Sequence, residues 1–330
     1  MLFHDQKVLV AGGTGLIGSN LIKRLLQEGA AVRATLHKKD PVIVDERIEY
    51  LRCDLTRGED CKKVVDGMRY VFLCAASTSG AATIAADPMI HVTPNLLINS
   101  QMLEAAYKAH AKKFLWLGST VAYPVSEKPV REEDVFQGEP YEKYFFAGWA
   151  KRFAEILCQM YGVKLPNPMT TIILRPTNVY GPGDDFEFET SHVIPALIRK
   201  VVERWDPIEV WGTGDDVRDA IYIDDMVEAM VTAMKELDSY TAINIGLGKG
   251  HNVKEILEMI LELDGYTNAR IAFNPSKPTM IPIRLIDTDK AERKLGFVAK
   301  TGLQEGLRKT IEWYRESRKL PRVPNGASER

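Results

Sequence analysis

The chain has few of the features that mark secreted, membrane or nucleic-acid-binding proteins. Its 330 residues include four cysteines, Cys53, Cys61, Cys74 and Cys158, which are too few for a disulfide framework and lack the paired spacing of a zinc site. No apolar run approaches the roughly 20 residues of a membrane-spanning helix. The formal net charge is −2, and no long run of lysine and arginine offers a surface for a duplex. We therefore expect a cytoplasmic protein that binds neither membranes nor nucleic acid.

The chain does have an ordinary globular composition. Hydrophobic residues make up 45% and charged residues 27%, which is enough apolar sequence for one large core or two smaller ones. Only residues 318–330 resemble a frayed polar tail. The chain passes from MLFHDQ directly into the apolar run VLVAGG, which predicts a folded strand and not a signal peptide.

Residues 7–30 predict a strand, a glycine turn and a helix. An apolar run breaks at glycines, and apolar residues then recur at helical spacing. Gly12, Gly15 and Gly18 suit, in turn, a tight bend, the approach of backbone N–H groups to a pyrophosphate, and close packing of helix on strand. The pattern predicts a dinucleotide site, with a simple tight turn as the alternative. The other residues of this turn expected to contact the coenzyme are Thr14, Leu16 and Ile17.

The end of the next strand, near residue 36, decides which nicotinamide coenzyme we expect. An acidic residue there would hydrogen-bond the ribose 2′-OH of NAD, whereas a cation accommodates the 2′-phosphate of NADP. His37, Lys38 and Lys39 follow the strand, and Asp40 stands farther out. NADP is therefore the expected coenzyme and NAD the second choice. The alternative is a solvated strand edge with exposed lysines.

Two later strand ends supply further candidates for the coenzyme site. Asp54 and Leu55 follow a short strand, where a carboxylate would meet the adenine amino group or would instead cap the turn that follows. Ala75 and Ala76 follow the strand YVFLC and are small enough for backbone to run beside a dinucleotide, although close packing is an alternative reason. Strands that alternate with helices such as residues 95–110 predict an α/β fold with a doubly wound parallel sheet.

Several segments, in order, resemble the extended short-chain dehydrogenase/reductase family, in its branch of nucleotide-sugar epimerases, dehydratases and reductases. They are AGGTGLIG, CDL, GSTVAYP, GWAKR, LRPTNVYGPG and GDDVRDAIYIDD. HVIPALIRK and VWGTGDDVRD look most like the GDP-fucose synthase group, and VRATLHKKDP looks like the NADP-using dihydroflavonol reductases. The resemblance implies a Rossmann-type domain over residues 1–181 and a smaller α/β substrate domain over residues 182–330, with interleaved segments, in a homodimer.

The resemblance also assigns roles to single residues. Lys151 would bind the coenzyme ribose and lower the pKa of a proton-carrying tyrosine, while Ser119 and Thr120 would hydrogen-bond the sugar oxygen. Arg218 is similar to the arginine that binds the nucleotide diphosphate, and a surface ion pair with Asp215 or Asp219 is its alternative. The residues similar to those beside the coenzyme or sugar are Pro176, Asn178, Val179 and His192. His192 would act as a general acid or as a donor to the sugar, or would be structural.

The tyrosine of this constellation is missing. It would stand four residues before Lys151 on the same helical face, where the chain has Ala147. Three explanations are open: a nearby tyrosine substitutes, a bulge at Gly148 brings Tyr144 closer, or the proton shuttle has been lost. Tyr144, seven residues before Lys151 and therefore expected two turns away on the same helical face, is the preferred substitute, with aromatic packing as its alternative. The other tyrosines considered are Tyr123 and Tyr141.

Other missing residues narrow the reaction. Dehydratases of this family carry an Asp-Glu pair after the serine or threonine, where this chain has Val121 and Ala122, so dehydration is disfavoured. Val121 also replaces the cysteine of the GDP-fucose synthase group, which argues against double epimerisation. We predict an NAD(P)-dependent epimerase or 4-ketoreductase that transfers hydride at one carbon of a nucleoside-diphosphate sugar. A small-carbonyl reductase and a coenzyme-binding homologue with impaired or no catalysis are the alternatives.

Overall fold

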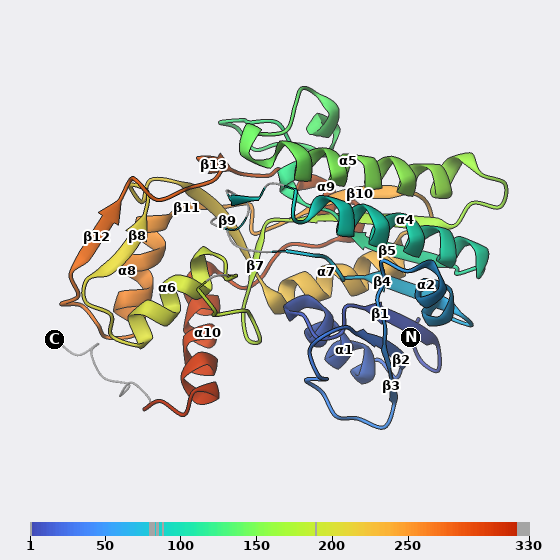
Figure 1. Cartoon of the computed structure of the whole chain (residues 1–330), viewed down its shortest axis with the longest axis horizontal. Helices are drawn as coiled ribbons and strands as arrows, with labels where there is room; N and C mark the ends of the chain where they lie inside the picture. The colour runs from blue at the N-terminus through green and yellow to red at the C-terminus, as the bar shows by residue number, and fades with distance from the viewer. Residues whose placement is uncertain (1, 79–82, 84–85, 88, 189, 322–330) are drawn as a thin grey trace.

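A seven-stranded parallel sheet forms the centre of the computed structural model, which describes residues 2–78, 83, 86–87, 89–188 and 190–321 (Figure 1). In spatial order its strands are β10 (Thr241–Ile245), β6 (Thr170–Pro176), β5 (Lys113–Leu117), β4 (Tyr70–Leu73), β1 (Lys7–Ala11), β2 (Ala31–Leu36) and β3 (Ile48–Arg52). The order runs outward from β1 in both directions, so the predicted doubly wound parallel sheet is confirmed.

Helices cover both faces of this sheet, and the strands are accordingly apolar. One face carries α2 (Gly58–Val65), α4 (Val92–Lys108) and α5 (Phe145–Gln159), and the other carries α1 (Leu16–Gln27) and α7 (Ile223–Glu236) (Figure 1). Along β1, Val8 and Val10 join the core under α1 and α7, whereas Leu9 and Ala11 join the core under α2, α4 and α5. One short strand therefore contributes to two separate cores.

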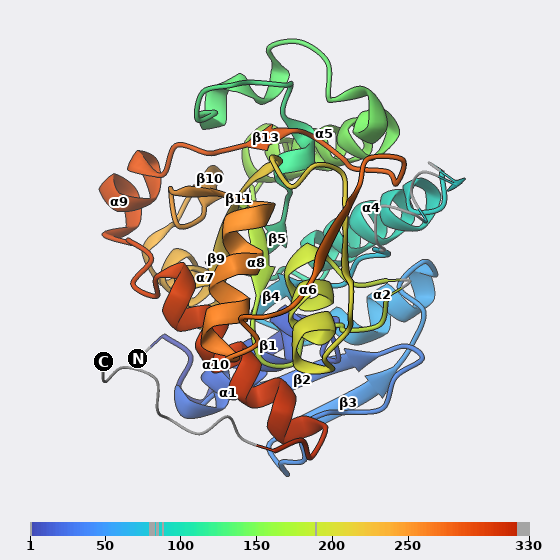
Figure 2. The same cartoon turned by 90° about the vertical axis from the view of Figure 1, so that its left-hand side faces the viewer.

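A smaller part of the chain stands at the carboxyl edge of the sheet, because β7 follows directly after β6. Its four-stranded sheet consists of β7 (Asn178–Tyr180), β9 (Val217–Tyr222), β11 (Gly250–Asn252) and β13 (Ile283–Arg284). A second pair joins β8 (Ile208–Trp211) to β12 (Ile271–Asn274). The helices α6 (Val193–Val202), α8 (Val253–Leu263) and α10 (Leu303–Ser317) lie side by side in it (Figure 2).

Segments of the two parts interleave along the chain. Strand β10 and helix α7 come from the second half of the sequence but belong to the large sheet, and α9 (Asp289–Leu295) packs against both. The division at residues 1–181 and 182–330 remains a prediction. None of the described helices combines the length and apolarity that crossing a membrane requires.

Short turns around α5 differ from the continuous helix that the sequence suggests. Three of them are 3₁₀ turns: η1 (Thr120–Ala122), η2 (Glu132–Phe136) and η3 (Glu142–Tyr144). The fourth, η4 (Met160–Lys164), is a wider π-helical turn that follows the end of α5. Because η3 precedes α5, the chain reaches the helix through a tighter turn than an α-helix allows.

Candidate active site

The turn between β1 and α1 contains two glycines that the packing of the protein itself requires. Gly12 has a φ of +95°, and a Cβ there would lie 2.6 Å from the backbone nitrogen of Ala75. A Cβ on Gly18 would lie 2.0 Å from the carbonyl oxygen of Gly12. Neither position accepts a side chain unless the backbone moves.

Gly15 has no such internal requirement. Its φ of −80° and ψ of 167° suit any residue, and the nearest atom to an added Cβ is the Gly12 carbonyl oxygen at 3.8 Å. Gly15 is exposed at the amino end of α1, where no side chain caps the helix and no acidic residue stands in the first turn. The space above these backbone N–H groups fits the diphosphate of a dinucleotide. The partly exposed neighbours are Thr14, Leu16 and Ile17.

The ends of β2 and β3 place the next candidates on one edge. His37 and Lys38 follow β2 and are exposed. Asp54 Oδ1 accepts hydrogen bonds from the Thr56 hydroxyl at 2.7 Å and the Thr56 N–H at 3.0 Å. The Thr56 hydroxyl lowers the pKa of Asp54 below its usual range. The alternative role of Asp54, capping the turn that follows, is therefore present, while Leu55 is buried in the core.

Two hydrogen bonds from a side chain to the backbone, which the sequence did not predict, hold the loop after β4. Ala75 lies against Gly12, and Ala76 beyond it is exposed. The Ser77 N–H donates to Asn95 Oδ1 at 2.9 Å, and Asn95 Nδ2 donates to the Ser77 carbonyl oxygen at 2.9 Å. Asn95 on α4 thus holds the strand end that faces the glycine turn.

Helix α5 lies directly against the turn that carries the predicted hydroxyl groups. A Cβ on Gly148 would lie 2.8 Å from the carbonyl oxygen of Val121 and 2.4 Å from Cβ of Pro140. The helix is regular from Phe145 to Gln159, so the structure has no bulge at Gly148. Gly148 instead permits close contact between α5 and the Thr120–Ala122 turn.

Lys151 lies one helical turn farther along α5 and points at the end of β5. Its Nζ donates to the Leu117 carbonyl oxygen at 3.1 Å and lies 4.8 Å from the centre of the Trp116 ring. Burial lowers the pKa of Lys151 to about 8. A half-buried lysine with a lowered pKa beside the strand end that precedes Ser119 is the arrangement expected of a functional lysine.

Tyr144 does not share a helical face with Lys151, and the expectation that it would is wrong. It ends the η3 turn and caps α5 with φ −108° and ψ 8°, outside the regular helix. It nevertheless lines a pocket together with Thr120, Asn178 and Arg218. The other lining residues, which sequence reasoning did not assign to the site, are Val121, Thr177, Asp219, Ile281 and Arg284.

Two arginines and one aspartate, Asp219, are the charged residues among those described as lining this pocket. Arg218 donates to Asp216 at 3.0 Å and to the Val217 carbonyl oxygen at 2.9 Å, so its ion pair is with Asp216 and not with Asp215 or Asp219. Arg284 is buried and donates to the Pro124 carbonyl oxygen at 3.1 Å. Burial lowers the pKa of Arg284 to about 10, with Arg218 adding to the effect. Burial raises the pKa of Tyr144, and the two arginines oppose that shift.

The other tyrosines that could replace the missing one are not placed to do so. Tyr123 is fully buried, accepts a hydrogen bond from Arg175 at 2.6 Å and donates one to Asn244 at 2.6 Å. Tyr141 packs edge-on against Tyr144, with 6.4 Å between the ring centres, and does not line the pocket. Tyr144 is therefore the candidate that the geometry retains.

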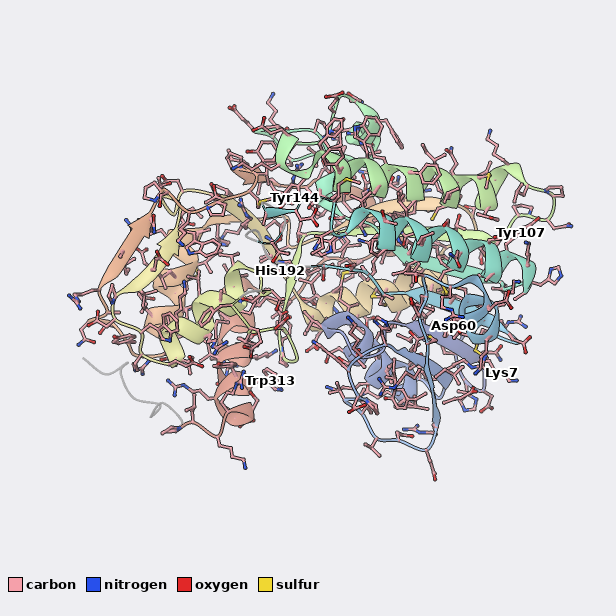
Figure 3. All side chains as sticks on the ribbon, in the orientation of Figure 1. Lys7, Asp60, Tyr107, Tyr144, His192 and Trp313 are labelled. Carbon is pink, nitrogen blue, oxygen red and sulfur yellow. The ribbon has the colours of Figure 1, made fainter. Side chains whose placement is uncertain are left out.

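The remaining predicted residues lie around the pocket but do not line it. Ser119 caps η1, where its Oγ accepts from the Val121 N–H at 3.2 Å. Pro176 ends β6 and Val179 lies in β7. His192 is exposed at the amino end of α6, and Figure 3 shows it and Tyr144 between the large sheet and the smaller part.

A buried ion pair joins two of the elements beneath this site, β6 and α5. Arg175 on β6 forms two hydrogen bonds, of 2.6 and 2.8 Å, with Glu155 on α5, and both side chains are at most 2% exposed. The same guanidinium donates to Tyr123, which follows the Thr120–Ala122 turn. The network therefore ties α5 to the strand and turn that carry the site.

Glu155→Gln is expected to lower the free energy of unfolding by about 3–5 kcal/mol, because it leaves the Arg175 charge buried without its partner. Urea unfolding measures the change. The matched control is Glu312→Gln, which removes an exposed ion pair with Arg308 and should cost less than about 1 kcal/mol. Equal effects of the two substitutions would contradict the supporting role of the buried pair.

Comparison with known proteins agrees with this geometry. The NAD dependent epimerase/dehydratase family pattern matches residues 8–246. A probable GDP-L-fucose synthase 1 of Oryza sativa subsp. japonica is 32% identical, over 94% of this chain and 92% of its own length. The UDP-glucose 4-epimerase of Thermotoga maritima, solved with UDP-glucose, has a TM-score of 0.84 at 26% identity, over 94% of this chain and 99% of its own. A GDP-6-OMe-4-keto-L-xylo-heptose reductase from C. jejuni has a TM-score of 0.82 at 25% identity, over 95% and 98%.

Proposed function

Because the chain belongs to the NAD dependent epimerase/dehydratase family, we propose that it is an NADP-dependent epimerase or 4-ketoreductase acting at one carbon of a nucleoside-diphosphate sugar. The observation that carries the proposal is the pocket that Arg218 and Arg284 line together with the hydroxyl-bearing Thr120 and Tyr144. Guanidinium groups suit a diphosphate, and hydroxyl groups suit a sugar oxygen. A substrate with both parts would satisfy both halves of the pocket.

The coenzyme would supply hydride transfer to or from the sugar carbon. The backbone N–H groups at the start of α1 would hold its diphosphate, and Lys151 would bind its ribose. His37 and Lys38 at the end of β2 support NADP over NAD because they offer positive charge to a 2′-phosphate. Asp54, Leu55 and the Ala75–Ala76 edge would border the adenosine half.

The residues at the pocket would position the sugar and handle its proton. Thr120 would hydrogen-bond the reacting oxygen, and Tyr144 would donate or accept its proton in place of the residue missing at position 147. Asn178 and Arg218 would hold the substrate, and His192 would meet it from the amino end of α6. Val121 and Ala122 provide no acid–base pair, which is why we propose no dehydration step.

Ala147 supports a second candidate, a coenzyme-binding homologue with little or no catalysis. Thermal unfolding with NADP, NAD and UDP-, GDP-, dTDP- and CDP-sugars separates the candidates, because a ligand that binds only the folded state raises the melting temperature. The enzyme proposal predicts stabilisation by NADP and by one nucleotide sugar, with a change in nicotinamide absorbance. Stabilisation without that change favours the second candidate.

A small-carbonyl reductase is a third candidate, and it would not need Arg218 to bind its substrate. Unaltered turnover in Arg218→Ala would therefore favour this third candidate.

Tyr144→Phe is expected to reduce turnover at least tenfold while leaving nucleotide-sugar affinity within about twofold, because only the proton-bearing hydroxyl is lost. Single-turnover kinetics and calorimetry measure the two quantities. Tyr141→Phe is the matched control, since its ring packs beside Tyr144 but lies outside the pocket. Unchanged turnover in Tyr144→Phe would remove Tyr144 from the mechanism.

The proposal includes a homodimer and a cytoplasmic location. Phe146, Trp149, Phe153 and Ile156 form an exposed apolar stripe along α5, each between 41% and 49% exposed, beside the 39% exposed Leu97 of α4. A second copy of the same two helices would bury this stripe as a self-complementary interface. Trp149→Glu is expected to shift the mass measured by sedimentation from dimer to monomer. A wild-type monomer at micromolar concentration would contradict the dimer.

A further inference from the structure

An arginine on the neighbouring strand holds the segment that follows β2. Strands β2 and β3 pair in parallel with Leu36 opposite Arg52, so Arg52 stands at the same edge as the end of β2. Its Nη1 donates to the His37 carbonyl oxygen at 2.7 Å, and its Nη2 donates to Asp40 Oδ1 at 2.6 Å. The guanidinium thus spans the segment where the coenzyme's adenosine ribose is proposed to lie.

Asp40 is the carboxylate that determines the charge at this edge. An unpaired carboxylate after this strand would favour a ribose 2′-OH and repel a 2′-phosphate. Here Asp40 is paired with Arg52, whereas His37, Lys38 and Lys39 are exposed around it. The segment therefore presents a positive surface despite its aspartate.

We propose that Arg52 is a specificity-determining residue that makes the coenzyme site prefer NADP to NAD. Its positive charge offsets the negative charge of Asp40. Its other N–H groups can donate paired hydrogen bonds to the oxygens of a 2′-phosphate. This role of Arg52 rests on the proposed function, because it requires that the coenzyme binds at the end of β2. Arg52 is half exposed, so it can exchange Asp40 for a phosphate without a buried contact being broken.

The test uses two nucleotides that differ only in the phosphate at issue, 2′,5′-ADP and 5′-ADP, titrated by calorimetry into the whole protein. Arg52→Gln is expected to weaken 2′,5′-ADP by about tenfold and 5′-ADP by less than about twofold, which is the size of one charged contact. Asp40→Asn is expected to tighten 2′,5′-ADP severalfold, because a like charge is removed. NADP and NAD should follow the same order.

Arg47→Gln is the matched control. Arg47 forms a comparable pair with Asp45 at 2.6 Å, but it precedes β3 and therefore lies at the opposite end of that strand. It should leave both affinities unchanged. If Arg52→Gln lowered the affinity for both nucleotides equally, Arg52 would only hold the loop in place, and the inference would be overturned. Unchanged affinity for both nucleotides would overturn it as well. If the wild type binds neither nucleotide, the proposed coenzyme site fails first, and this inference fails with it.

Discussion

Ala147→Tyr is expected to raise turnover by about 100-fold, the low end of what a positioned general acid–base contributes. Position 147 lies four residues before Lys151 on regular helix, which puts the two side chains about 5–6 Å apart on one face. The lysine would lower the pKa of the new phenol. The same helix contacts the Thr120–Ala122 turn closely at Gly148. The gain is read from initial rates of nicotinamide absorbance with the nucleotide sugar identified by thermal unfolding.

Ala147→Phe is the control for this gain, since it adds the same ring without a proton to transfer. It should show no increase, and the Tyr144→Phe change should lose its effect once position 147 carries tyrosine. Equal rates for Ala147→Tyr and Ala147→Phe would contradict the acid–base account. They would also support the coenzyme-binding homologue over the enzyme.

Gly15→Val is expected to weaken NADP binding by about 100-fold while changing the free energy of unfolding by less than about 1 kcal/mol. Its backbone angles accept a branched residue, but the side chain would occupy the space above the helix N-terminus that a diphosphate needs. Calorimetric titration gives the affinity, and urea unfolding gives the stability.

Gly18→Ala is the contrasting variant in the same turn. Its Cβ would lie 2.0 Å from the Gly12 carbonyl oxygen, so we expect it to destabilise the fold by at least about 1–3 kcal/mol. Comparison of the two variants distinguishes a glycine that ligand binding requires, Gly15, from a glycine that packing requires, Gly18. If Gly15→Val lost stability as Gly18→Ala does, Gly15 would be required for packing and not for a diphosphate.

The sequence predicted the large sheet because its signals are local. The Gly12–Gly18 turn and the alternation of apolar strands with helices are readable within short windows, and the parallel order follows from that alternation. The positions of Thr120, Asn178 and Arg218 in one pocket agree with what the resemblance implied. Their roles remain proposals.

The rest of the site depends on contacts between distant segments. Tyr144 leaves the helix because η3 intervenes before α5, whose entry is fixed by Gly148 against Pro140 and Val121. No periodicity in residues 141–152 marks that turn. Arg284 reaches the pocket from a two-residue strand far along the chain, and such a short segment carries no detectable pattern of its own.

Calorimetric titration of the wild-type protein with NADP and then NAD decides whether the chain holds a nicotinamide coenzyme. The glycine turn, the lysine at the end of β5 and the positive edge at β2 together predict one coenzyme site per chain that binds NADP more tightly than NAD. Absence of binding heat for both coenzymes, in protein shown to be folded by its cooperative unfolding, would contradict the account.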